Sequence, residues 1–81
     1  MKELKISLNT IEKVKKFVNI VSKYDSNEIP MDLVSDRYIV DAKSIMGIFS
    51  LDLSKDINLI IHTENTTLIN DLLENIKPFI C

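Results

Sequence analysis

The sequence has few of the residues from which reactive or ligand-binding sites are usually built. Its 81 residues include one cysteine, one histidine, one glycine and no tryptophan. A lone cysteine, Cys81, excludes an internal disulfide and fits a reducing compartment such as the cytoplasm. A single glycine excludes a Gly-rich loop of the kind that cradles phosphates in nucleotide-binding proteins.

No constellation of reactive side chains stands out either. His62 follows an apolar segment, and together with Glu64 it makes too weak a pair to indicate a metal site. Cys81 lacks a local motif that would activate its thiol. Nucleophile-elbow, Walker and dinucleotide-binding patterns are absent. The sequence therefore predicts a protein that is not an enzyme and that has no metal site and no cofactor.

Charge and hydropathy restrict the partners. The net charge of −2 gives no electrostatic reason to expect binding to nucleic acid or to an anionic membrane. No segment approaches the roughly 20 apolar residues that cross a bilayer, and charged residues without an apolar run after them make the N-terminus unlike a signal peptide. The lysines of the first sixteen residues are interpreted as a solvated face. We expect a soluble, cytoplasmic protein.

Hydrophobic periodicity predicts the secondary structure of one domain over residues 1–81. Alternation over residues 4–8 indicates a strand, and apolar residues at three- and four-residue spacing indicate a helix from Ile11 to about Tyr24, capped by Asn9 or Thr10. Further elements are expected at the following places: strands Met31–Val34, Tyr38–Ala42 and Ile57–Ile61, a short helix from Ser44 to about Leu51, and a helix capped by Asn65 or Thr66 and stopped by Pro78.

This order, β-α-β-β-α-β-α, predicts an α+β fold with a four-stranded antiparallel sheet and helices on one face. The side chains expected to pack against the sheet are those at helical spacing in the two longer helices: Ile11, Val14, Val18, Val21, Leu68, Leu72 and Ile76.

One segment resembles a known family. Residues 43–51, Lys-Ser-Ile-Met-Gly-Ile-Phe-Ser-Leu, are similar to the K-S-I-M-G-V-M-S-L block of HPr, the carrier protein of the bacterial sugar phosphotransferase system. Residues 22–25 and 56–60 resemble the end of the first HPr helix and the last HPr strand, and the order of elements agrees. The resemblance implies an open-faced β-sandwich with three helices and a role connected with phosphoenolpyruvate-dependent sugar transport.

The sequence departs from the family where the family carries phosphate. HPr uses a histidine in G-I-H-A-R-P ahead of its first helix. Alignment back from Ser22-Lys23-Tyr24 brings that histidine near Thr10 and the supporting arginine onto Glu12, with the loop shortened, and Thr10 can equally be a plain helix N-cap. A threonine phosphate is a stable ester that is not passed on. We therefore expect that this protein is not a histidine phosphocarrier. The spacing from Tyr24 to Ser44 is also longer than in the family, which indicates an insertion near residues 27–30.

Ser44 aligns with the serine that a dedicated kinase phosphorylates in regulatory HPr proteins of Gram-positive bacteria, and it is also a natural helix N-cap. Ile45, Met46 and Phe49 match the apolar patch through which family members contact partners, although one of the three is expected to be buried. Ser44 is thus the candidate for regulatory phosphorylation, and the other three are the candidates for partner binding.

Two functions remain open. The first is a regulatory or partner-binding HPr-like protein, with a phosphotransferase-system component, an HPr kinase or a transcriptional regulator as its partner. The second is an HPr-derived protein-interaction module with no role in sugar transport. In both cases the expected molecule is a monomer or a weak homodimer.

Overall fold

The computed structural model describes residues 1–81, and its four strands form one antiparallel sheet. The strands run in the order β1-β4-β2-β3, so β4 lies between β1 and β2 while β1 and β3 are the edges. Their bounds are β1 Lys2–Ile6, β2 Met31–Ser35, β3 Tyr38–Asp41 and β4 Ile57–Ile61. The predicted α+β fold with an antiparallel sheet is confirmed.

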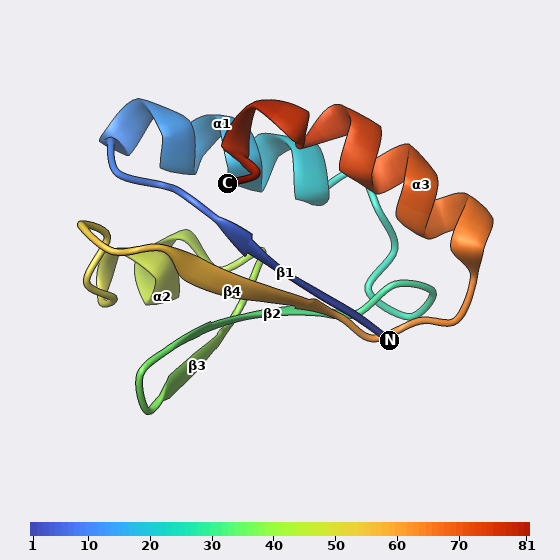
Figure 1. Ribbon diagram of the computed structural model, residues 1–81, viewed down its shortest axis with the longest axis horizontal. Helices are drawn as coiled ribbons and strands as arrows, with labels where there is room; N and C mark the ends of the chain where they lie inside the picture. Colours follow the sequence, from blue (N-terminus) through green and yellow to red (C-terminus); the bar gives the residue numbers. More distant parts are fainter.

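Helices α1 and α2 each join two strands, and α3 follows the last strand; the three helices cover one face of the sheet, as Figure 1 shows for α1 and α3. Their bounds are α1 Ile11–Val21, α2 Ile45–Phe49 and α3 Thr66–Asn75, and a 3-10 turn, η1, spans Lys77–Phe79. Each α-helix begins at a polar residue whose side chain accepts a hydrogen bond from the backbone three residues later: Thr10, Ser44 and Asn65. None of these helices has the length and apolar run that crossing a bilayer requires.

The core lies between the sheet and the helices. In β4 the fully buried Ile57, Leu59 and Ile61 alternate with half-buried residues, as expected for a strand with one covered face. The buried residues of α1 are Val14, Phe17 and Val21, which share one helical face. The sheet and this helical face together make one continuous hydrophobic cluster.

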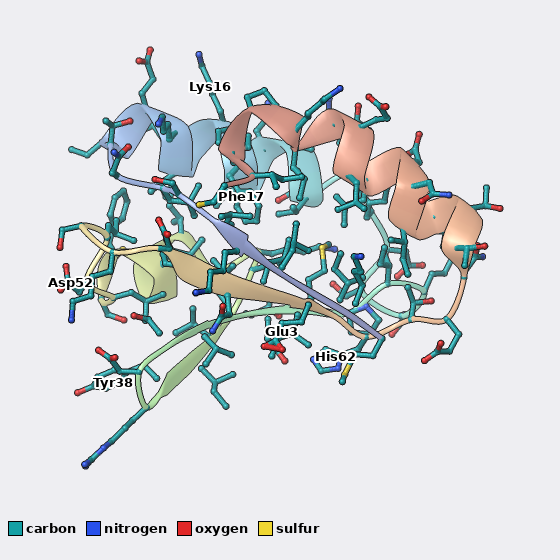
Figure 2. All side chains as sticks on the ribbon, viewed as in Figure 1. Glu3, Lys16, Phe17, Tyr38, Asp52 and His62 are labelled. Carbon is teal, nitrogen blue, oxygen red and sulfur yellow. The ribbon has the colours of Figure 1, made fainter.

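The expected core is correct in part. Val14, Val21, Leu72 and Ile76 are buried, and Val18 and Leu68 are half-buried. Ile11 was assigned wrongly, because its side chain is 63% exposed: it lies in the first turn of α1, which extends beyond the end of β1 (Figure 1). Phe17 and Ile69 were not among the expected core residues, but both are buried, whereas the adjacent Val18 and Leu68 are only half-buried. Figure 2 shows Phe17 pointing from α1 toward the sheet.

The first strand is displaced from the predicted one. Its ladder covers Lys2–Ile6 rather than residues 4–8, although Leu8 is fully buried. Beyond Ile6 the backbone has a different partner, because Ser7 N–H donates to the Phe79 carbonyl at 2.8 Å and Cys81 N–H donates to the Lys5 carbonyl at 3.1 Å. Residues 79–81 therefore cover the outer edge of β1 at its C-terminal end.

Some other boundaries also differ. Helix α1 ends at Val21 rather than near Tyr24, and α2 is shorter than residues 44–51. The chain then forms a turn in which Asp25 accepts backbone hydrogen bonds through its carbonyl from Ile29 (2.8 Å) and through Oδ1 from Asn27 (2.9 Å). Ile29 is buried. The segment predicted to carry an insertion is thus anchored to the core.

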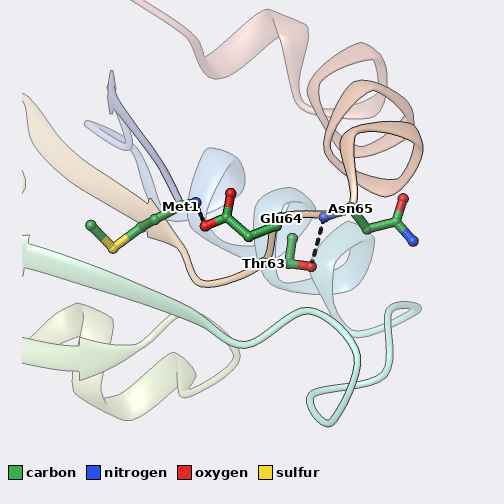
Figure 3. Close-up of polar contacts among 4 residues, drawn as sticks. All are labelled: Met1, Thr63, Glu64 and Asn65. Atoms are coloured by element: carbon green, nitrogen blue, oxygen red, sulfur yellow. Dashed lines mark hydrogen bonds and ion pairs between the residues drawn. The ribbon is translucent and has the colours of Figure 1, made fainter.

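The loop from β4 to α3 is held by short-range contacts (Figure 3). Asn65 N–H donates to Thr63 Oγ1 at 3.2 Å, and Asn65 Oδ1 in turn accepts from Leu68 N–H. The Met1 ammonium group lies 2.5 Å from Glu64 Oε1. Both charged groups are largely exposed, so this ion pair contributes little to stability.

Tyr24 connects the end of α1 to α3. Its hydroxyl donates to Asp71 Oδ2 at 2.6 Å and accepts from Asn75 Nδ2 at 2.7 Å. Desolvation of the phenol, followed by the hydrogen bond to Asp71, raises the pKa of Tyr24 above its ordinary value. The folded chain therefore holds this proton more tightly than the unfolded chain does.

We predict that Tyr24→Phe lowers the free energy of unfolding at neutral pH by about 1 kcal/mol, because two partly exposed hydrogen bonds are lost. Since the pKa is raised by folding, the contribution is complete below about pH 10 and is lost as the pH rises through the folded-state value. Urea unfolding at about pH 7 and about pH 11 measures the difference. Tyr38→Phe, at an exposed tyrosine, is the control. If the difference in free energy of unfolding between the wild type and Tyr24→Phe is as large at about pH 11 as at about pH 7, the Tyr24 hydroxyl does not make the stabilising contacts described here.

Candidate functional site

Helix α2 presents an exposed polar N-cap. Ser44 is exposed, and its Oγ accepts a hydrogen bond from Gly47 N–H at 3.2 Å. At the other end of the helix, Ser50 Oγ donates to the Gly47 carbonyl at 2.5 Å. Side-chain caps at both ends hold a helix that is too short to be stable by itself. The Ser44 hydroxyl is at the surface, where another molecule can reach it.

The apolar side chains of α2 divide between the surface and the core. Met46 is 79% exposed and Phe49 is 40% exposed, whereas Ile45 is half-buried. The fully buried residue of this helix is Ile48. The expectation that one of Ile45, Met46 and Phe49 is buried is therefore wrong: Ile48 supplies the core contact and leaves all three at least partly at the surface.

Gly47 lets α2 lie close to β3. A Cβ at this position would stand 3.0 Å from Ser44 Oγ, 3.1 Å from Val40 Cβ and 3.3 Å from Val40 Cγ1. These separations are shorter than ordinary contacts, and Val40 has little freedom to move because its Cβ belongs to a strand. A glycine therefore keeps both the Ser44 cap and the packing of the helix on the sheet.

Lys43 fixes the approach to α2. Its backbone N–H donates to Asp41 Oδ1 at 2.8 Å, and its ammonium group donates to the Tyr24 carbonyl and to Ser26 Oγ, the latter at 2.8 Å. Lys43 thus connects the segment before Ser44 to the end of α1. Sequence reasoning missed this role because Tyr24 and Ser26 are distant in the chain and no local pattern marks them as partners.

Thr10 lies at the beginning of α1. Its side chain is exposed, and Oγ1 accepts a hydrogen bond from Lys13 N–H at 3.1 Å, which is the geometry of an N-cap. Glu12 occupies the first turn of the helix. In Figure 1 the beginning of α1 and the whole of α2 lie at the same end of the sheet. Thr10, the N-cap of α1, and helix α2 are thus at one end of the molecule.

His62 lies at the opposite end. It follows Ile61, which pairs with Lys2 at the start of β1, whereas α1 follows the other end of β1, where Ile6 pairs with Ile57. Four residues of strand, roughly 13 Å, separate the two ends, and Figure 2 shows His62 away from the beginning of α1. His62 Nε2 is 2.9 Å from Asp32 Oδ2.

The remaining candidates for chemistry do not form a site. The structure holds no group of three or more His, Cys, Asp and Glu side chains that could bind a metal ion. Desolvation, and then a hydrogen bond to Asp56, raise the pKa of the Cys81 thiol even though the residue as a whole is exposed. A raised pKa reduces the thiolate fraction at neutral pH, so Cys81 is not an activated nucleophile.

Comparisons with known proteins agree with this geometry. A model of the PTS-HPr family, described as the PTS HPr component phosphorylation site, matches residues 12–80. HPr-C-His from Thermoanaerobacter tengcongensis superposes with a TM-score of 0.71 and 28% identity, over 95% of this chain and 92% of that one. The phosphocarrier protein HPr from Bacillus anthracis str. Ames has the same fold, with a TM-score of 0.67, 22% identity and coverage of 99% and 94%.

A search of curated proteins gives no match. The family match begins at Glu12 and leaves out Thr10, and it includes the whole of α2 with its Ser44 cap. It spans far more than half of the sequence, and the fold superposes on a solved HPr protein over 95% of this chain. This chain therefore belongs to the PTS-HPr family.

Proposed function

We propose that this protein is a regulatory, partner-binding member of the PTS-HPr family that works through the α2 face, defined as Ser44, Ile45, Met46 and Phe49, and not through a phosphohistidine. Members of the family are phosphocarriers and not enzymes, and they interact with proteins of the phosphotransferase system. The partner proposed here is a protein of that system, an HPr kinase or a transcriptional regulator, met in the cytoplasm.

The observation that carries the proposal is the exposure of Met46 and Phe49 on a helix that begins at an exposed serine. Met46 and Phe49 are three residues apart on the helix and therefore neighbours on its surface, and a contiguous exposed apolar patch is typical of a protein-binding site. The polar Ser44 cap stands beside them and supplies a rim, which is the usual composition of a protein-binding patch. The caps at both ends of α2 hold this patch in one arrangement before a partner arrives, which reduces the entropy cost of binding.

The case against phosphohistidine rests on distance and charge. The one histidine is at the far end of the sheet from α1, and its ring is already paired with Asp32. At the beginning of α1 the chain presents Thr10 and Glu12. A carboxylate in the first turn repels a phosphoryl group that an arginine would attract.

Phosphorylation of Ser44 is proposed as the regulatory event. A phosphate adds about −1.5 to −2 charges at neutral pH. It would stand at the N-terminal end of α2, where unpaired backbone N–H groups favour negative charge, so the helix need not unfold. The added charge changes the rim of the α2 face and with it the choice of partner.

We predict that Met46→Glu reduces binding of the partner at least tenfold, because a carboxylate replaces the most exposed apolar side chain of the face. Ser44→Asp should change the affinity with little effect on stability, since aspartate also caps helices well. The measurement is pull-down from a cell extract, followed by titration of the purified partner. Asn70→Glu, which adds the same charge on α3, is the control for Met46→Glu.

A partner whose affinity is unchanged by both substitutions places the working surface elsewhere and contradicts the proposal. If binding does depend on Met46 but the partner is unrelated to sugar transport, the interaction module is the correct function. A purified HPr kinase that leaves Ser44 unmodified would remove the regulatory part of the proposal and retain the binding face.

A further inference from the structure

The two edges of the sheet differ. Residues 79–81 cover the C-terminal end of the outer edge of β1, through an isolated bridge between Ile6 and Ile80 and through the hydrogen bond from Cys81 N–H to the Lys5 carbonyl. Strand β3 pairs with β2 on one side and has no strand on the other. In Figure 1 the β2–β3 hairpin projects from the lower side of the molecule. The β1 edge is thus covered in part, whereas no strand covers any of the β3 edge.

The open edge has backbone groups available for pairing. Ala42 N–H donates to the Met31 carbonyl at 3.1 Å, which makes Met31 and Ala42 a hydrogen-bonded pair in the register of the hairpin. Such pairs alternate in an antiparallel ladder, so Tyr38 and Val40 also bond to β2. The N–H and carbonyl of Ile39 and the N–H of Asp41 consequently point away from the sheet, while the Asp41 carbonyl accepts from Ser44 N–H.

The side chains of β3 do not protect this edge. Strand β3, Tyr-Ile-Val-Asp, is short and carries one charge at Asp41, but it has no lysine, proline or bulge of the kind that guards many open edges. Tyr38 is 66% exposed and Ile39 is 67% exposed. They project from opposite faces of the strand, because successive side chains alternate. An added strand would cover both.

We propose that the open edge of β3 binds β3 of a second copy of this chain, antiparallel, to form one continuous sheet across a two-fold axis. The two-fold axis passes beside Ile39, so the Ile39 N–H of each copy donates to the Ile39 carbonyl of the other copy. Tyr38 then lies opposite Val40 of the second copy on the helix-covered face, an aromatic and a β-branched side chain that pack well across strands.

The charges beside β3 favour this register and favour a second copy of this chain as the partner. Pairing Ile39 with itself brings Arg37 of each copy opposite Asp41 of the other, so two opposite-charge pairs flank the axis. Within one chain Asp41 stands directly across from Asp32, whose Oδ2 lies 2.9 Å from His62 Nε2. The arginine of the second copy would bring a positive charge beside Asp41, which has no basic side chain as a partner within its own chain. Only five residues of each copy, 37–41, lie opposite one another, so the dimer is weak and depends on concentration.

The experiment measures the dimer dissociation constant by analytical ultracentrifugation of the full chain at low salt, up to millimolar concentration. Arg37→Glu should raise the dissociation constant roughly tenfold or more. Because of the two-fold symmetry, one substitution replaces two attractive Arg–Asp pairs with two repulsive Glu–Asp pairs. Lys15→Glu makes the same change of charge at an exposed position on α1 and should leave the constant unaltered. Ile39→Pro should abolish the dimer, since it removes only an N–H that points away from β2.

A restoring variant separates pairing from damage to the fold. Asp41→Asn keeps an oxygen for the hydrogen bond from Lys43 N–H and removes the charge, so combining it with Arg37→Glu should recover much of the lost affinity. Circular dichroism and the unfolding midpoint verify that each variant folds. A wild-type chain that stays monomeric at millimolar concentration, or an Arg37→Glu chain that dimerises as the wild type does, overturns the proposal.

Discussion

Phe17→Ala is expected to leave much of the protein unfolded at room temperature. The Phe17 side chain is fully buried, and its ring meets the ring of Phe79 edge to face, with centroids 5.9 Å apart and planes at 89°. Truncation of a buried phenylalanine costs about 3–5 kcal/mol. The whole free energy of unfolding of a small domain is about 5 kcal/mol at the low end of the usual range. The substitution therefore removes most of the stability.

Urea unfolding followed by circular dichroism measures this effect. Ile11→Ala is the matched control, because it truncates a large apolar side chain of the same helix at an exposed position and should cost no more than about 0.5 kcal/mol. If Phe17→Ala shifts the unfolding midpoint no further than Ile11→Ala does, then α1 packs on the sheet through a different face from the one described above.

Incubation with phosphoenolpyruvate and enzyme I of the phosphotransferase system is expected to leave this protein without an acid-labile phosphate. A phosphohistidine is a labile phosphoramidate, and no histidine lies before α1 that could form one. Thr10 is an exposed N-cap whose phosphate would be a stable ester, and Glu12 repels the incoming group. No label is expected on this protein, and the phosphocarrier protein HPr from Bacillus anthracis, treated in the same way, is the positive control.

His62→Ala tests the one place from which a label could come. If the wild type accepts phosphate with near-unit stoichiometry and His62→Ala does not, the phosphorylation site has moved to the far end of β4 and the proposed function is wrong. A label that persists in His62→Ala would also contradict it, because the acceptor would then be a residue other than histidine.

Local patterns predicted the elements well where capping and alternation coincide. Strand β4 has the predicted bounds, and Thr10 and Asn65 cap α1 and α3. It was harder to predict which residues of α1 face the sheet. Ile11, Val14 and Val18 fit the same apolar stripe as Phe17, and only the position of the sheet under α1 decides that Phe17 is buried and Ile11 is not. Sequence periodicity has no information about where the sheet ends.

The candidate site shows the same division. Ser44 and the apolar residues of α2 were identified from a short block of sequence, and the structure puts Met46 and Phe49 at the surface. The connections of this site to the rest of the molecule were not predicted. Lys43 meets Tyr24, and Val40 lies against Gly47, because strand pairing brings β3 and the end of α1 to α2. Such long-range neighbours follow from the order β1-β4-β2-β3, which periodicity alone does not determine.

That strand order has a consequence for synthesis on the ribosome. Strand β1 is made first, but its partners are β4 and residues 79–81, so it has nothing to pair with until the chain has grown past residue 57. Until then α1 has only an unfinished sheet on which to lay its apolar face. A chain dominated by such distant pairings folds late and cooperatively. Val14 and Phe17, which are buried in the folded protein, therefore have no complete sheet to pack on until β4 has been made.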